Sequence, residues 1–172
     1  MDPEGGFPPF DLNDDWRRAG VYHPVTWIKN GILNDLLHDR EYAGTELGLP
    51  IGQPDSGAYR MSGGTTSLDE MIATTKRGLL VTRFDQIVKL DSRSVLLRGY
   101  TRDGLWLVEN GKISKPVKNL VFTESVLFAL NNVEQLGVPQ RVYHGGMRRP
   151  VPAIVPPMKV RDFSFTALSD AV

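Results

Sequence analysis

Few residues of this chain are of the types that act as nucleophiles or metal ligands. The 172 residues include no cysteine, which excludes disulfides, thiol nucleophiles and thiolate metal ligands. The three histidines, His23, His38 and His144, are too far apart to form the i, i+4 pair that holds a metal on one helix. The sequence also lacks Gly-x-Ser-x-Gly, a phosphate-binding glycine loop with lysine, and His-Glu-x-x-His. The chain therefore has no self-contained catalytic signature.

A small cluster of polar residues surrounds the second histidine. Asp35 and Asp39 flank His38 in the sequence and could orient its imidazole, as carboxylates do at metal and catalytic sites. A polar surface cluster at a strand end or on a short helix explains the same three residues with no chemistry. We prefer the surface interpretation and assign no reaction to this cluster.

The C-terminal third of the chain is locally basic and contains interleaved aromatic residues. The residues concerned are Arg141, Tyr143, Arg148, Arg149, Lys159, Arg161 and Phe163. Such a pattern could bind nucleic acid. Over the whole chain, however, 20 Lys and Arg residues balance 20 Asp and Glu residues. A solvated face without nucleic acid is the preferred interpretation, because no net field attracts a polyanion.

The composition predicts one globular domain. With 41% hydrophobic and 23% charged residues, the chain belongs to the ordinary soluble class. Residues 1–24 are rich in Pro, Gly and Asp, so we expect an extended N-terminal arm, followed by a single domain over 25–172. No stretch approaches 18 apolar residues, and the N-terminus lacks the apolar segment of a signal peptide. We expect a cytoplasmic protein that does not associate with membranes.

Two Asn-Gly dipeptides predict the principal hairpins. Asn30-Gly31 separates VTWI from ILNDLL, and Asn110-Gly111 separates GLWLVE from KISKPV. Both residues of a type I′ turn need positive φ, which Asn-Gly adopts at low cost. A further strand over 94–100 is predicted to reach a turn at 102–104 before the second hairpin.

Two short helices are expected beside these strands. Ser67 begins a capping-box pattern, which predicts a helix over roughly 68–77 that stops at Gly78, with the strand LLVTRF after it. Thr123 is expected to cap a second helix, whose apolar stripe ends near Gly137.

Two segments of the chain are expected to have little regular structure. Residues 44–66 are rich in Gly, Pro, Ser and Thr, and a long segment of this kind is usually functional or mobile, so it is the best candidate for a binding loop. The tail from Pro150 contains prolines at 150, 152, 156 and 157. We expect it to be extended and to pair poorly until an edge or terminal strand within 158–165.

Apart from these turn, helix and strand patterns, several segments resemble one protein family. SLDEMIATTKRGLLVTRF at 67–84 and GLWLVENGKISKPV at 104–117 are similar to the TldD/PmbA family in order, turn and closing Pro-Val, and WIKNGILNDLLHDREYA is similar to a stretch upstream of them. The resemblance covers about 25–168 and is to the C-terminal domain of the family. It implies an α+β fold that is mostly β, with antiparallel sheets and hairpins and two short helices packed on them.

The resemblance also implies how zinc would be bound in such a system. In the family, a separate N-terminal domain supplies a helix with His-Glu-x-x-x-His, and the C-terminal domain of active members adds a cysteine ligand. Counting back from Val151-Pro152 places His144-Gly145 where the Cys-Gly of active members would stand. Because imidazole nitrogen can also bind zinc, His144 is either a replacement ligand or an ordinary loop residue. Zinc is expected only with a partner that supplies His-Glu-x-x-x-His.

The function implied by this resemblance is a C-terminal domain of a zinc metallopeptidase system, acting in peptide binding and subunit assembly. We expect a homodimer, or a heterodimer with a TldD/PmbA-type subunit, and an extended peptide as substrate. The candidate substrate-binding residues are Gly63, Gly64, Thr65 and Gly145, and the chain alone is expected to be inactive as a peptidase. The alternatives are a nucleic-acid-binding or gyrase-related regulatory module and a non-functional gene fragment.

Overall fold

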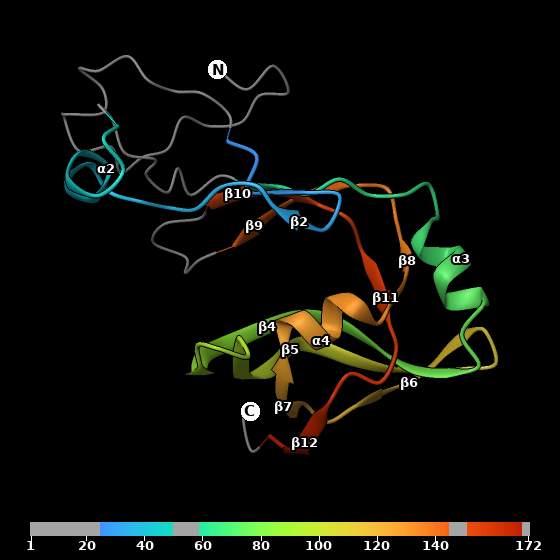
Figure 1. Ribbon diagram of the computed structural model, residues 1–172. Helices are drawn as coiled ribbons and strands as arrows, with labels where there is room; N and C mark the ends of the chain where they lie inside the picture. Colours follow the sequence, from blue (N-terminus) through green and yellow to red (C-terminus); the bar gives the residue numbers. More distant parts are fainter. Residues whose placement is uncertain (1–24, 50–58, 145–150, 170–172) are drawn as a thin grey trace. The chain divides into compact units, whose positions relative to one another are not determined.

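The structure is a computed structural model that describes residues 25–49, 59–144 and 151–169 (Figure 1). The expected arm at 1–24 lies outside the described residues. The chain divides into two compact units, one formed by residues 1–60 and 141–154 and the other by residues 61–140 and 155–172.

The first unit contains a short hairpin, one helix and a three-stranded sheet. The hairpin pairs β1 (Ile28–Lys29) with β2 (Ile32–Leu33), and helix α2 spans Arg40–Thr45. The strand order in the sheet is β3-β10-β9. These strands are β3 (Tyr59–Arg60), β9 (Gln140–His144) and β10 (Val151–Val155). The proline-rich tail was thus wrongly expected to pair poorly before residue 158, because β10 runs parallel to β3.

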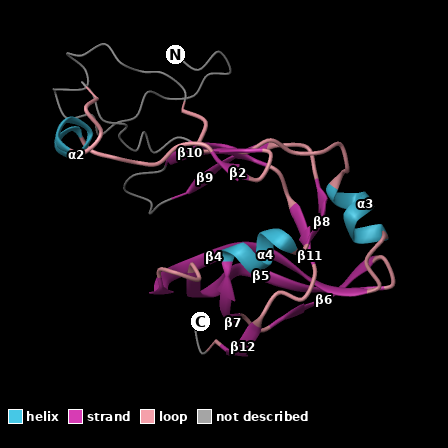
Figure 2. Cartoon of the chain, viewed as in Figure 1, coloured by secondary structure: helices cyan, strands magenta, loops and turns pink. Residues whose placement is uncertain are grey.

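The second unit is built on a five-stranded sheet (Figure 2). Its strands are β4 (Arg77–Asp91), β5 (Leu96–Glu109), β6 (Lys112–Val117), β7 (Leu120–Ser125) and β12 (Phe165–Leu168). The order is β12-β7-β5-β4, and β6 also pairs with β5. One edge of β5 is therefore shared, since β7 pairs with residues 96–100 and β6 with residues 105–109.

Two helices and a small antiparallel pair of strands complete the second unit. Helix α3 spans Leu68–Ala73 and helix α4 spans Val126–Asn131. Strand β8 (Val133–Leu136) pairs with β11 (Met158–Val160). The expectation of a mostly β, α+β fold with antiparallel sheets and short helices is confirmed, although the described residues contain three helices rather than two. Within the described ranges, no helix combines the length and the apolar character needed to cross a membrane.

The two Asn-Gly turns form as their sequence predicts. Asn30 and Asn110 have φ of 52° and 51°, and Gly31 and Gly111 have φ of 77° and 78°. This left-handed backbone at both central residues is typical of a type I′ turn, whose twist matches that of the flanking strands. Both predicted hairpins are confirmed, although β1 and β2 have only two residues each.

The predicted turn at 102–104 is wrong, because β5 continues through it. Asp103 and Gly104 have φ of 60° and 121°, so they have the backbone that a turn needs. The register with β4 shifts between Val81 and Arg83 at this position, which makes the pair a β-bulge. The chain bends and twists here but does not reverse.

Both predicted helices are present but are shorter than expected. Helix α3 begins at the predicted cap and ends with Thr74 as its C-cap, while Gly78 lies inside β4. The second helix is capped by Ser125 rather than Thr123, because the strand β7 extends to Ser125 before the helix begins. Thr123 does not cap the helix, because it lies within β7, where it pairs with Arg98 of β5.

Aromatic side chains gather on the sheet of the second unit. Phe84 lies 4.7 Å from Phe122 and 5.6 Å from Phe163 between ring centroids, and Phe163 lies 5.2 Å from Phe165. Such offset and edge-on pairs stabilise a core by about 0.5–1.5 kcal/mol each beyond the area they bury. The cluster links β4, β7 and β12 with the segment before β12.

Candidate functional site

The predicted loop residues Gly63, Gly64 and Thr65 lie in an irregular segment of the second unit, with a bend at Thr65. All three are exposed, yet the segment is fixed by its backbone. The amide of Gly64 donates a hydrogen bond to the carbonyl of Gly137 at 2.9 Å. Thr66 forms a parallel β-bridge with the same residue, Gly137. Residues 63–65 are thus irregular, with a bend at Thr65, but the segment is held in place by its backbone contacts with Gly137.

Close backbone approach explains why two glycines stand in this segment. A Cβ at Gly63 would lie 2.8 Å from the Pro139 ring, and a Cβ at Gly64 would lie closer than 3.0 Å to the carbonyl oxygen of Leu136. Real Cβ atoms do not approach backbone oxygen so closely, so neither position accepts a side chain without displacement of the segment 136–139. The glycines thus have a packing role whether or not they also contact a ligand.

Gly137 is the point at which three distant segments meet. It accepts the hydrogen bond from Gly64 and donates its own amide to the carbonyl of Pro157 at 2.9 Å. A Cβ here would lie 2.6 Å from the Pro157 ring and 2.9 Å from the Thr66 carbonyl oxygen. The sequence signal for this role is only a glycine after a helix, which was interpreted as the end of α4.

Helix α3 begins directly after the exposed segment and holds its end. Ser67 accepts a hydrogen bond from the Glu70 amide at 3.2 Å, and the Glu70 carboxylate accepts from the Ser67 amide at 2.7 Å. The predicted capping box is confirmed. The Ser67 amide, followed by the Ser67 hydroxyl, lowers the pKa of Glu70 from its ordinary value, because both donors favour the charged carboxylate.

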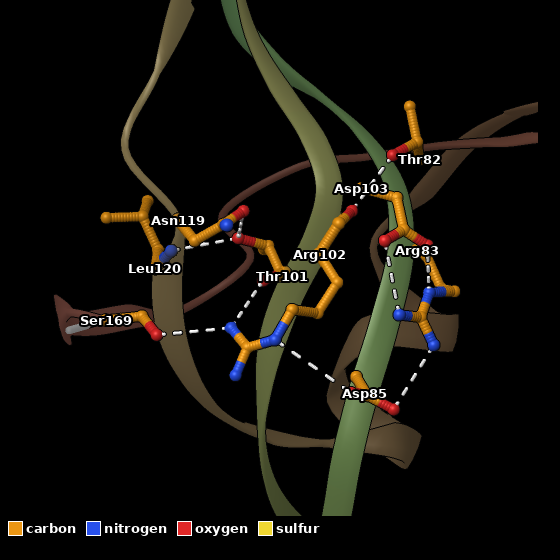
Figure 3. A network of polar contacts seen from close by, with 9 residues as sticks. All are labelled: Thr82, Arg83, Asp85, Thr101, Arg102, Asp103, Asn119, Leu120 and Ser169. Atoms are coloured by element: carbon orange, nitrogen blue, oxygen red, sulfur yellow. Dashed lines mark hydrogen bonds and ion pairs between the residues drawn. The ribbon is translucent and has the colours of Figure 1, made fainter. Parts of the chain in front are cut away.

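A network of charged side chains spans the bulged part of β4 and β5 (Figure 3). Arg83 forms an ion pair with Asp103 and a second one with Asp85, the latter at 3.3 Å between Nη1 and Oδ1. Arg102 reaches Asp85 at 3.9 Å and donates to the Ser169 hydroxyl at 3.2 Å. The hydrogen bond that Arg83 donates to Asp103 is the main cause of the raised pKa of Arg83.

The buried end of this network reaches strand β7 and the residue that precedes it. Thr101 is fully buried, and its hydroxyl accepts from the Leu120 amide at 2.9 Å and donates to the Asn119 side chain at 3.1 Å (Figure 3). These bonds satisfy a hydroxyl that would otherwise be costly to bury. Sequence reasoning missed the network, because its members come together only through the strand register.

The candidates near the histidines belong to the first unit. His144 is the last residue of β9, and its side chain lies outside the described set, as does Gly145. His38 places Nδ1 at 2.9 Å from the Leu36 carbonyl, while Asp39 caps α2 by accepting from the Tyr42 amide at 2.8 Å. Asp39 therefore serves the helix, in agreement with the surface interpretation of the cluster.

Metal-binding geometry is absent from the part of the chain that the structure describes. No group of three or more His, Asp or Glu residues comes together there in a way that could hold a metal ion. Gly63, Gly64 and Thr65 fall in the second unit, and His144 falls in the first. The predicted site residues are thus divided between the two units.

Two of the basic residues considered above make local contacts. Lys159 donates from Nζ to the carbonyl and the hydroxyl of Thr74, both at 3.2 Å. Arg161 pairs with Asp162 at 3.2 Å between Nε and Oδ2. Both contacts lie within the second unit, while Arg148 and Arg149 lie outside the described residues.

Comparisons with known proteins identify the relatives of the chain. It is 28% identical over 143 residues to a metalloprotease of Methanothermobacter thermautotrophicus, a match that covers 77% of this chain and 30% of that protein. The structure is similar to TldE of Thermococcus kodakarensis, with a TM-score of 0.62 at 15% identity, covering 83% of this chain and 33% of that one. It is also similar to a protein of Bacteroides thetaiotaomicron designated a modulator of DNA gyrase, with a TM-score of 0.62 at 24% identity, covering 82% and 30% of the two chains.

These relatives are about three times as long as the matched region. The chain spans 30% of the metalloprotease and 33% of TldE. The solved structures share its fold. At 15% and 24% sequence identity, this similarity shows the fold alone. A family model described as the PmbA/TldA metallopeptidase C-terminal domain matches residues 20–167, which is most of the sequence. The chain therefore belongs to the TldD/PmbA metallopeptidase family and corresponds to its C-terminal domain.

Proposed function

We propose that this chain acts in a TldD/PmbA-type zinc metallopeptidase system as the domain that binds peptide and assembles subunits. The observation that carries the proposal is the exposed segment 63–65, which is held by its backbone. It is exposed, the hydrogen bond from Gly64 to Gly137 fixes its backbone in advance, and the next residue, Thr66, forms a β-bridge with Gly137. A backbone ordered before binding loses less conformational entropy when an extended peptide pairs with it.

Zinc binding in this system would need ligand residues in addition to those of this chain. A metallopeptidase zinc site needs three protein ligands and an open position for water, and the ion activates that water as a nucleophile. The described residues hold no cluster of three ligand side chains, so a His-Glu-x-x-x-His helix from a partner would have to supply two of them. His144 is proposed as the third, since neutral imidazole replaces thiolate on zinc.

The proposal is tested by activity with and without such a partner. We expect no cleavage of an unstructured peptide by this chain with added zinc, and chelator-sensitive cleavage when a family subunit carrying His-Glu-x-x-x-His is added. The partner alone is the control. Cleavage by this chain without the partner would overturn the division of labour. No gain over the partner alone would remove the role in proteolysis.

Peptide binding by the backbone of the exposed segment has its own test. Thr65→Pro removes an amide donor from an exposed position, whereas the matched control Thr65→Ala removes only the side chain. We expect Thr65→Pro to weaken binding of a fluorescent unstructured peptide at least tenfold, measured by anisotropy, and Thr65→Ala to leave it unchanged. Equal binding by both variants, each folded by circular dichroism, would place the peptide elsewhere.

The role of His144 is measured on zinc rather than on turnover. In a complex with the His-Glu-x-x-x-His partner, His144→Ala should weaken zinc binding by about 10–100-fold in competition with a chelating dye, and His144→Cys should preserve it. Unchanged zinc affinity in His144→Ala would leave this chain without a metal ligand in the system.

A further inference from the structure

Strand β4 is a long edge strand. Among the residues that the structure describes, it pairs with β5 alone, although it has 15 residues. Apolar side chains along it are unusually exposed, with 38% for Phe84, 50% for Ile87, 53% for Val88 and 52% for Leu90. A long edge with exposed apolar residues is a template for pairing with another strand.

The sequence of β4 is complementary to itself in the antiparallel direction. When two copies are related by a two-fold axis through Phe84, Arg83 of each strand faces Asp85 of the other, and the two Phe84 residues are neighbours. Further out, Val81 faces Ile87 or Val88, depending on which residue of the bulge at 86–87 is passed over. Opposite charges and apolar pairs directly across from each other stabilise antiparallel strands.

Nearby registers are less favourable. An axis through Arg83 or through Asp85 would place two like charges directly opposite each other, which destabilises a strand pair. An axis through Ile87 would again pair opposite charges, but it lies in the bulge, where Gln86 has a left-handed φ of 47°. A bulge at the axis would interrupt both ladders at once. Residues 83–85 pair with β5 without a register shift, so an axis at Phe84 avoids both problems.

We propose that two copies of this chain associate by antiparallel pairing of β4 with β4, centred on Phe84, to form one continuous sheet. The inference rests on the proposed role in subunit assembly and specifies its surface. Arg83 and Asp85 already contact each other within the strand at 3.3 Å, so both lie on one face with their charged groups at the same level. Two copies would extend this contact into a four-residue charge array across the axis.

A single introduced cysteine tests the axis, because the chain has none of its own. Residues paired directly across antiparallel strands have Cα atoms about 4.5–5.5 Å apart, within the range that a disulfide bridges. Phe84→Cys should therefore form a cross-linked dimer under mild oxidation. The matched control Ile87→Cys, exposed on the same strand, should remain largely uncrosslinked, because three residues from the axis place its two copies roughly 20 Å apart along the strands.

These experiments distinguish failure of the β4–β4 pairing from failure of homodimer formation. Sedimentation of the unaltered chain shows whether two copies associate at all, and a monomer across micromolar concentrations would overturn both this pairing and homodimer assembly. A dimer in which Phe84→Cys does not cross-link, or in which Ile87→Cys cross-links more strongly, overturns the pairing but leaves assembly standing. A monomer that protects β4 amides from exchange only when an unstructured peptide is added would assign the edge to peptide instead.

Further cysteine variants are needed in case loss of the Phe84 ring prevents folding, since its centroid lies 4.7 Å from that of Phe122. If Phe84→Cys does not fold, the Val81→Cys chain is mixed in equal amounts with Ile87→Cys and, separately, with Val88→Cys. We expect one of the two mixtures to give a cross-linked heterodimer in several-fold excess over any of the three chains oxidised alone. No excess in either mixture, in samples that sediment as dimers, would overturn the pairing.

Discussion

Glycines in this chain differ in what surrounds their Cα atoms. Gly64 and Gly137 lie against backbone of other segments, where even one added carbon would collide, whereas Gly44 has nothing within 4 Å of the position a Cβ would take. Close approach of other backbone segments thus requires glycine at Gly64 and Gly137, whereas no neighbouring atom requires it at Gly44. At Gly64 and Gly137, close backbone contacts therefore decide which residue type is tolerated.

Gly64→Ala is expected to destabilise the second unit by about 1–3 kcal/mol, because the new Cβ would press on the Leu136 carbonyl or break the hydrogen bond to Gly137. Gly44→Ala is the matched control and should be neutral or slightly stabilising, since it lies in helix α2. Urea denaturation of the two variants and the parent chain measures both effects. Equal stability of Gly64→Ala and the parent would contradict the close approach.

Glu70 gives the capping box a pH dependence whose direction follows from its lowered pKa. A carboxyl whose pKa is depressed by folding stabilises the fold above its ordinary value of 4.5, and this contribution is lost as the pH falls through the folded value. The difference in melting temperature between the parent and Glu70→Gln should therefore be constant near neutral pH and shrink below pH 4.5. A difference that grows on acidification would contradict the assignment.

At the scale of elements, local chemistry predicted some features well. Asn-Gly supplied both type I′ turns, and Ser67 with Glu70 supplied the start of α3, because each of these signals acts within four residues. The bulge at Asp103 was predicted as a turn, because the two structures need the same positive φ. Only the strand opposite, which no local pattern reveals, decides between them.

Longer-range features of the candidate site were beyond local patterns for the same reason. The segment at 63–65 was predicted as a binding loop from its glycines, and the structure shows an exposed segment there. Its docking on Gly137 could not be predicted, because the partner is 73 residues away from Gly64 and carries no distinguishing side chain. Strand β10 was missed because its prolines argued against pairing, although it pairs with β3.

Ser125 makes α4 and the β4–β5 connection interdependent. Its hydroxyl accepts from the Phe128 amide at the helix start and donates to the Ser94 carbonyl at 2.6 Å. Ser125→Ala should destabilise the chain by about 0.5–2 kcal/mol and speed exchange of the Phe128 amide. Ser114→Ala, at an exposed position on β6, is the control and should change neither. An unaltered Phe128 amide in Ser125→Ala would show that the cap is not used.

At the scale of the whole molecule, charge balance bears on the nucleic-acid alternative. The formal net charge is zero, and both Lys159 and Arg161 have partners within their own unit. We expect no retention on DNA at physiological salt, and no steep fall of any weak binding with added salt. A mobility-shift titration across salt concentrations measures this. Binding whose affinity falls steeply with salt, and is reduced by Arg161→Ala, would support the regulatory alternative.

The meeting of three segments at Gly137 has a consequence for the order of events in time. Its two backbone bonds close loops from residue 64 to 137 and from 137 to 157, so they gain nothing until the sheet between them exists. We expect this junction to form after the folding barrier. Gly137→Ala should accordingly accelerate unfolding while leaving the refolding rate nearly unchanged in stopped-flow measurements. The segment that presents Gly63–Thr65 would then be the last part of the second unit to dock and the first to open.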